Sequence, residues 1–276
     1  MTTSLAPAWS GLVDDAAIFP PGDAPLPEAV AAHVARRDEW YADLVGGFVV
    51  TDVRIPEITE QLSLAIVVTG GAGAIEGALK LGARGGHEVA GVEIALRDLD
   101  DLAGNARRVT KAADAAGLDP ETVYVELPHA PDIGAWLRAA DEVAAAGMRL
   151  KFRSGGLEEH LFPATHALAR WIDAALDRET PFKCTAGLHN AVRHDADDGF
   201  THHGFLNVLL ATFRAFDGAT ADEVAAVLDE RDANALAQAA GSEDLTRARR
   251  WFTSFGSCSV QEPLDDLIAL GLQEKP

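Results

Sequence analysis

The strongest constraint on the fold is a regular alternation of short runs rich in Val, Ile, Phe and Tyr with longer alanine-rich stretches. We interpret the short runs as strands, because β-branched and aromatic residues fit the pleated surface of a sheet. Many of the alanine-rich stretches end at a glycine, which tolerates the left-handed conformation at which helices stop. The unit repeats every ~30 residues, the length of a strand–helix–strand unit with parallel strands.

This pattern places eight strands and the helices between them. Strands are expected at residues 12–19, 47–52, 64–69, 89–96, 122–127, 149–153, 182–185 and 255–260. Helices are expected at residues 27–41, 72–81, 99–116, 133–146, 163–176, 204–216, 243–252 and 263–270, and one more begins at the capping box from Thr220 to Glu223. The sequence therefore predicts an α/β protein, a (β/α)8 TIM-type barrel with a helical insertion between strands seven and eight, at about residues 189–253.

The alternative architecture is an open, doubly wound sheet. Such sheets often carry a glycine-rich phosphate turn after the first strand, but here that turn contains Pro20, Pro21 and a single glycine, Gly22. The 276 residues suit one barrel, and the chain contains no linker rich in Pro, Gly or Ser. We therefore expect a single domain that spans residues 1–276.

The charge and composition restrict the classes of partner. Acidic residues outnumber basic ones by 43 to 23, for a net charge of −20, which disfavours nucleic acid and anionic membranes. No apolar run approaches the roughly 18 residues of a membrane span. Residues 1–10 lack the pattern of a signal peptide, and two cysteines make no disulfide framework. These features predict a cytoplasmic protein.

Two lysines in the middle of neighbouring strands are the main chemical signal. Lys151 and Lys183 should both face the barrel interior, although lysine is depleted in strands and is rarely buried without a partner. A buried lysine beside another cation has a lowered pKa and becomes a nucleophilic amine that can form a Schiff base. The alternative is that both lysines are ion-paired in a structural network with Glu93 on strand four or Glu126 on strand five.

Other polar residues lie near the ends of the strands. Asp14 or Asp15 on the first strand could reach a substrate or close the barrel floor. If Lys183 on the seventh strand and Ser257 and Ser259 on the eighth point inward, alternation turns Cys184 and Cys258 away from the site, to pack beneath the helices as small apolar residues.

The two lysine motifs resemble those of the Schiff-base aldolases of the deoxyribose-phosphate aldolase group. In both motifs, the lysine is followed two or three residues later by Ser or Thr and then by Gly. In that family, the lysine on strand six forms the imine and the lysine on strand seven lowers its pKa. The resemblance therefore implies that Lys151 is the nucleophile and Lys183 the perturbing cation.

The resemblance covers these two short motifs and the expected fold. It departs at strand four, where the family has an aspartate and this chain has Glu93, and at Arg153, which the family does not require. Membership of a bacterial barrel family without an assigned activity is the alternative.

Glycine turns follow both lysine strands and suggest an anion site. Backbone N–H groups in such turns can hold a phosphate or carboxylate, and Arg153 would add positive charge. The expected anion-binding residues are Arg153, Ser154, Gly155, Gly156, Thr185 and Gly187. The alternative is a pair of ordinary turns.

Histidines gather after the seventh strand. His189 follows this strand directly and could act as a general acid or base, because imidazole titrates near neutrality. A metal site would use Glu93, Glu126 and His189, but metal ligands must converge on one point, and the five-residue gap between His189 and His194 in a loop does not guarantee this. We therefore assign no metal ligand, and the cofactor stays open.

Three functions are compatible with these residues. The leading hypothesis is an enzyme that acts on a small anionic carbonyl metabolite by lyase or aldolase chemistry, in which Lys151 or Lys183 supplies an amine or a cation and Glu93 or Glu126 moves the proton. A metal-dependent hydrolase or isomerase is the second. A non-catalytic barrel that binds a ligand, or that assembles into a homo-oligomer through the apolar helix at 204–216, is the third.

Overall fold

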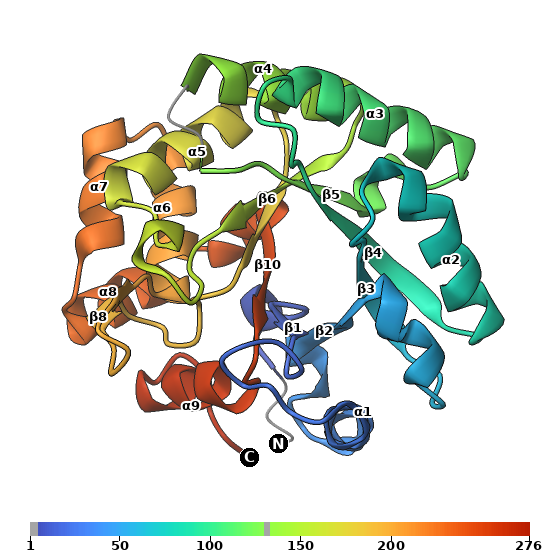
Figure 1. Cartoon of the computed structure of the whole chain (residues 1–276). Helices are drawn as coiled ribbons and strands as arrows, with labels where there is room; N and C mark the ends of the chain where they lie inside the picture. The colour runs from blue at the N-terminus through green and yellow to red at the C-terminus, as the bar shows by residue number, and fades with distance from the viewer. Residues whose placement is uncertain (1–4, 130–132) are drawn as a thin grey trace.

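The computed structural model describes residues 5–129 and 133–276 and contains a closed barrel of eight parallel strands surrounded by helices (Figure 1). In their order around the barrel, the strands are β1 (Val13–Asp15), β2 (Val45–Thr51), β3 (Ser63–Val67), β4 (Glu88–Ala95), β5 (Val123–Glu126), β6 (Arg149–Arg153), β7 (Phe182–Thr185) and β10 (Phe252–Ser257), which pairs with β1 again. This closure confirms the (β/α)8 prediction and excludes the open sheet.

Helices follow most of the strands and cover the outside of the barrel (Figure 1). They are α1 (Leu26–Ala35), α2 (Ile75–Arg84), α3 (Leu102–Ala115), α4 (Ile133–Ala145), α5 (Thr165–Asp177) and α9 (Gln261–Ala269). Each places an apolar stripe inward, such as Trp136, Ala140 and Val143 of α4, which are buried. Among the described residues, no helix has the length and apolar character needed to cross a membrane.

The connection between β7 and β10 carries the expected insertion. It contains α6 (Phe205–Phe216), α7 (Ala221–Asp229), which begins at the predicted capping box, and a 3-10 turn (Leu245–Arg250) in place of the α-helix expected at 243–252. The sequence analysis missed α8 (Ala233–Ser242) and the short hairpin of β8 (His194–Asp195) and β9 (Thr201–His202). The apolar residues of α6 from Phe205 to Phe213 are buried within the chain, and Phe205 stacks on Phe255 of the barrel, so this part of the helix is not a free dimer face.

The first and last strands differ from their predicted bounds. β1 has only three residues, because the chain turns directly after it, where the amide of Phe19 donates to the carbonyl of Ala16 at 2.9 Å. β10 begins at Phe252, three residues before the expected start, and ends at Ser257. Cys258 therefore lies in the loop after β10, where strand alternation no longer determines the direction of its side chain.

The alternation within the strands separates an apolar outer face from a charged interior. Phe152, Phe182 and Phe252 lie between the strands and the helices, with ring centroids 4.7 and 5.5 Å apart along the series. The neighbouring residues on the same strands, Lys151 and Lys183, point the other way into the barrel. The aromatic layer holds β6, β7 and β10 together from outside.

We predict that Phe182→Ala lowers the free energy of unfolding by about 3–5 kcal/mol, because the buried ring leaves a cavity beneath the helices. Phe182 has no exposed surface, whereas Val53 is 68% exposed. Val53→Ala should therefore change the free energy of unfolding by less than about 0.5 kcal/mol. Urea denaturation followed by circular dichroism measures both values. Equal losses in the two variants would contradict the assignment of this aromatic layer to the core.

Candidate active site

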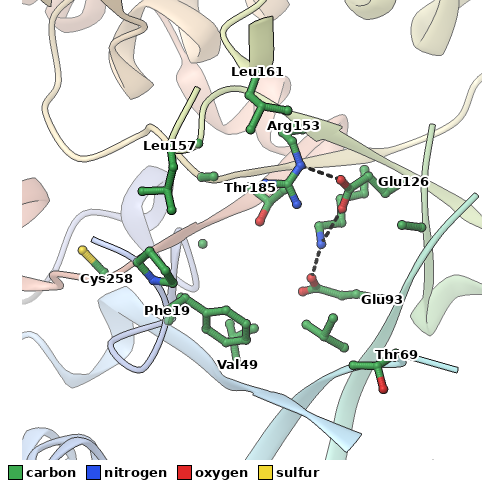
Figure 2. Close-up of a pocket in the computed structure, with 18 of the residues that line it drawn as sticks. Phe19, Val49, Thr69, Glu93, Glu126, Arg153, Leu157, Leu161, Thr185 and Cys258 are labelled. Carbon is green, nitrogen blue, oxygen red and sulfur yellow. Dashed lines mark hydrogen bonds and ion pairs between the residues drawn. The ribbon is translucent and has the colours of Figure 1, made fainter. Parts of the chain in front are cut away.

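A cavity of about 450 Å³ opens at the carboxyl ends of the strands. Its wall includes the last residues of several strands, among them Val67, Ala95, Glu126, Arg153 and Thr185. This is the end at which barrel enzymes of this type carry their active sites. Figure 2 shows Glu93 and Glu126 on one side of the cavity and Leu157 and Cys258 on the other.

A network of charges forms the floor of this cavity. The Lys151 ammonium lies 2.7 Å from Oε2 of Glu93 and 3.0 Å from Oε2 of Glu126. The other carboxylate oxygen of Glu126 accepts a hydrogen bond from Nε of Arg153 at 2.8 Å. Lys151, Glu93 and Glu126 are all buried, whereas Arg153 is about one-third exposed. The four groups place two positive charges against two negative charges at the base of the cavity.

The network continues below this floor. Lys183 donates to Oε1 of Glu93 at 2.5 Å and to Oδ2 of Asp14 at 2.6 Å. The same Asp14 oxygen accepts from the Ser254 hydroxyl at 2.7 Å, and the Lys183 ammonium lies 5.2 Å from the centre of the Tyr124 ring. Glu93 thus bridges the two lysines, one through each carboxylate oxygen.

Small residues make room for these charges inside the barrel. The Gly47 amide donates to Oδ1 of Asp14, and a Cβ at Gly46 would lie only 2.3 Å from that same oxygen. Ala65 and Gly91 border a second cavity of about 50 Å³ beside Lys183. A side chain at Gly46 would displace the Asp14 carboxylate, and one at Gly91 would press against the Tyr124 ring at 3.3 Å.

Mutual pairing keeps Glu93, Glu126 and Lys151 charged. Burial alone raises the pKa of Glu93, but the two lysines outweigh it and lower this pKa from 4.5 to about 2. The pKa of Glu126 is lowered as well, because Lys151 and Arg153 outweigh the effect of burial. Burial lowers the pKa of Lys151, but the carboxylates of Glu126 and Glu93 raise it by more than burial lowers it, so the net shift is upward.

The structure agrees with only part of what the sequence predicts for Lys151 and Lys183. Both face the interior, but only Lys151 lines the large cavity, while Lys183 lines the small one beneath it. The pKa of Lys183 is also raised, because Asp14 and Glu93 outweigh its burial. The prediction of a lowered lysine pKa is thus wrong for the resting protein, since each ammonium contacts two carboxylates.

The expected anion-binding residues fall into two groups. Arg153, Thr185 and Gly156 line the cavity, and so does the exposed Arg97, which the sequence analysis did not single out. Ser154 instead donates from its hydroxyl to the carbonyl of Ala186 at 2.6 Å, which ties the two turns together.

Close packing explains why two of the glycines are required. A Cβ added to Gly155 would lie 2.7 Å from Cα of Gly187, and Gly187 itself has a φ of +75°. These two glycines therefore serve the contact between the turns after β6 and β7. The N–H cradle predicted for these turns stays a prediction.

Apolar side chains form much of the remaining wall. Phe19, Val49 and Val67 come from the first three strand regions, and Leu157 and Leu161 come from the loop after β6 (Figure 2). Leu157 is 68% exposed, an unusual position for leucine that is explained by its place at the cavity. Leu157 and Leu161 were not expected from the sequence, because strand patterning carries no information about loop residues.

His189 has partners that the sequence did not predict. Its Nδ1 lies 2.9 Å from a carboxylate oxygen of Glu262 in the first turn of α9, and its ring nitrogens lie 3.8 and 3.7 Å from Sγ of Cys258. Both His189 and Cys258 line the cavity. The expectation that Cys258 points away is therefore wrong, whereas Cys184 is buried as predicted. The expected eighth strand, residues 255–260, contained Cys258, so strand alternation gave the wrong direction, and only the end of β10 at Ser257 corrects it.

The two acidic residues of β1 point to opposite faces of the strand. Asp15 points outward, where its Oδ2 lies 3.0 Å from Nδ1 of His33 and accepts from Arg36 at 2.7 Å. Asp14 is the member of the pair that enters the interior network.

Within residues 5–129 and 133–276, no group of three or more His, Cys, Asp or Glu side chains is placed to hold a metal ion. Glu93 and Glu126 both contact lysines, and His189 contacts Glu262. The three side chains suggested for a metal site thus have other partners.

No protein-family model matches the chain, and a search of curated proteins finds no match. The resemblance to the Schiff-base aldolases therefore rests on the two lysine motifs and on the barrel.

Glu93→Gln should lower the free energy of unfolding at pH 7 by about 3–5 kcal/mol, because it leaves two buried lysines short of a counter-charge. The folded-state pKa of Glu93 is lowered to about 2 from 4.5, so its stabilising effect is present above pH 4.5 and is lost as the pH falls through 2. The difference between wild type and Glu93→Gln should therefore shrink from pH 5 to pH 2.

Urea denaturation across this pH range measures the effect. Glu57 is exposed and pairs with Arg54 on the surface, so Glu57→Gln is the matched control and should leave the unfolding curve unchanged. A Glu93→Gln effect that stays constant from pH 5 to pH 2 would contradict the assigned charge on Glu93.

Proposed function

We propose that the protein is an enzyme that cleaves or forms a carbon–carbon bond in a small anionic carbonyl compound, with Lys151 as the imine-forming amine. The observation that carries this proposal is the placement of Lys151. It is a buried lysine at the floor of the large cavity, in contact with two carboxylates that can accept its proton. An amine that reacts with a carbonyl needs such a base beside it.

Arg153 offers a physical route to the neutral amine. In the resting protein, Arg153 and Lys151 together lower the pKa of Glu126. An anionic substrate that pairs with Arg153 would compete for this guanidinium and weaken its hold on Glu126. The pKa of Glu126 then rises, which favours transfer of a proton from Lys151 to Glu126. Substrate binding thus activates the amine that the resting network keeps protonated.

The covalent step uses groups that are already in contact. The neutral Nζ of Lys151 attacks the carbonyl carbon, the C=O π bond breaks, and the carbinolamine oxygen takes a proton and leaves as water. The resulting iminium accepts the electron pair of the carbon–carbon bond that breaks, and a base removes the proton of the departing alcohol, which becomes a carbonyl. Glu126 and Glu93 are the nearest bases to Lys151.

Lys183 serves as a positioning residue in this proposal. It does not line the large cavity, but it donates a hydrogen bond to Oε1 of Glu93. The other oxygen of Glu93, Oε2, then contacts Lys151. Its ammonium also opposes the positive charge on Lys151 and makes proton loss easier. The apolar wall of Phe19, Val49 and Leu157 supports a substrate that also carries an uncharged portion.

Borohydride trapping tests the imine. We expect sodium cyanoborohydride to fix a covalent adduct on Lys151 when the protein is incubated with pyruvate, dihydroxyacetone phosphate or glyceraldehyde 3-phosphate as carbonyl probes. The chain has five lysines, Lys80, Lys111, Lys151, Lys183 and Lys275, so peptide mapping by mass spectrometry assigns the site. At least one probe should give a single adduct in the intact protein.

The control is a lysine on the surface. Lys151→Ala should abolish the adduct, and Lys111→Ala, at an exposed position of α3, should leave it unchanged. An adduct of equal yield on Lys80, Lys111 and Lys151 would show non-specific chemistry and contradict the proposal. Saturable binding of a probe with no adduct on any lysine would favour a non-catalytic ligand-binding barrel.

A further inference from the structure

The cavity has a second group of reactive side chains, on the wall that faces the lysine network. Cys258 follows β10 directly, His189 follows β7, and Glu262 lies in the first turn of α9. Adjacent strands of the barrel therefore place the cysteine and the histidine at the same rim, because β10 pairs with β7. In Figure 2, Cys258 lies across the cavity from Glu93 and Glu126.

The order of contacts is thiol, imidazole, carboxylate. Nδ1 of His189 lies 2.9 Å from the Glu262 carboxylate, and Nε2 lies 3.7 Å from Sγ of Cys258. A carboxylate at Nδ1 holds the tautomer that carries its proton there, which leaves Nε2 free to accept a proton. Sγ is nearly equidistant from both nitrogens, and such contacts often align only when a substrate is bound.

The thiol is sheltered but reaches the cavity. Cys258 is half-buried and lines the cavity, while a Cβ on Gly22 would lie 2.8 Å from its Cβ, so the turn after β1 packs directly against it. Burial raises the pKa of the Cys258 thiol, Glu262 and Asp23 raise it further, and the Gly22 amide opposes them. The resting thiol is therefore protonated and needs a base in order to react.

We propose that Cys258, His189 and Glu262 form a catalytic triad in which Cys258 adds reversibly to the carbonyl carbon of an aldehyde bound in the cavity. Nε2 of His189 takes the thiol proton, the Sγ–C bond forms as the C=O π bond breaks, and the proton returns to the carbonyl oxygen. The product is a hemithioacetal, and the addition needs no oxidant or reductant. Glu262 acts as a positioning residue for the imidazole.

Thiol alkylation tests the activation of Cys258. The chain has two cysteines, and Cys184 is fully buried, so iodoacetamide should alkylate only Cys258 in the folded protein. His189→Asn should lower the alkylation rate by at least about tenfold, because the thiol loses its base. Glu262→Gln should lower it by less, and Glu262→Asp should restore it. Intact mass against time gives the rates.

The matched controls lie outside the cavity. His166 is an exposed histidine on α5, so His166→Asn should leave the rate unchanged, and so should Cys184→Ser. Circular dichroism of each variant checks that it is folded. Alkylation of Cys258 at the same rate in wild type and His189→Asn would overturn the triad, as would no reaction of Cys258 in the folded protein.

Aldehyde protection tests the addition itself and is measured in the wild-type protein and in Lys151→Ala, in which no imine on Lys151 can shield the thiol. Glycolaldehyde at saturating concentration should slow the alkylation of Cys258 by at least about tenfold, whereas ethylene glycol, which has a similar size and no carbonyl, should not. Equal rates with the two compounds would overturn the proposed addition.

The proposal stands apart from the imine on Lys151. Cys258 should be alkylated at the wild-type rate in Lys151→Ala, and Cys258→Ser should still give the cyanoborohydride adduct on Lys151. Loss of one reaction with retention of the other identifies which of the two proposals fails.

Discussion

The bridge that Glu93 makes between Lys151 and Lys183 is the contact on which the interior of this barrel depends. Barrels of this type usually fill their interior with branched apolar side chains. Here one carboxylate meets an ammonium through each of its oxygens, and Asp14 and Glu126 complete the pairing. Desolvation of these groups is costly, so the network is stable only when every member has its partner. Strands β1, β4, β5, β6 and β7 thereby share one electrostatic unit.

The same unit sets the reactivity of the cavity floor. Mutual pairing holds Lys151 protonated and its carboxylates ionised. This stabilises the fold, but the protonated amine cannot act as a nucleophile. Arg153 is the member of the network with the most solvent access, at 34% of its side chain. A bound anion would therefore act first on Arg153 and, through Glu126, on Lys151. In the proposed chemistry, a ligand that pairs with Arg153 thus changes the protonation of Lys151 through Glu126.

Two chemically distinct walls face each other across one cavity. The lysine side supplies charge and an amine, the cysteine side supplies a thiol with its base, and the apolar side chains of Phe19, Val49 and Leu157 border the cavity between them. The cavity that they share has a volume of about 450 Å³. The turns at Gly155 and Gly187 are buried and contact each other through their backbones, next to Arg153. Their glycines therefore set the shape of the cavity rim at this point.

Local patterning determined the eight parallel strands, the inward direction of Lys151 and Lys183, and the helical insertion, because strand and helix periodicities are properties of neighbouring residues. Patterning could not determine which charges meet. The raised lysine pKa values result from carboxylates on β1, β4 and β5, more than 20 residues away in the chain, and only barrel closure brings these within contact. The direction of Cys258 was decided by where β10 ends, and the contact between His189 and Glu262 was decided by how α9 returns to the rim. Neither the residue at which a strand ends nor the way a helix returns to the rim has a period in the sequence, so the tertiary structure alone decided that side of the site.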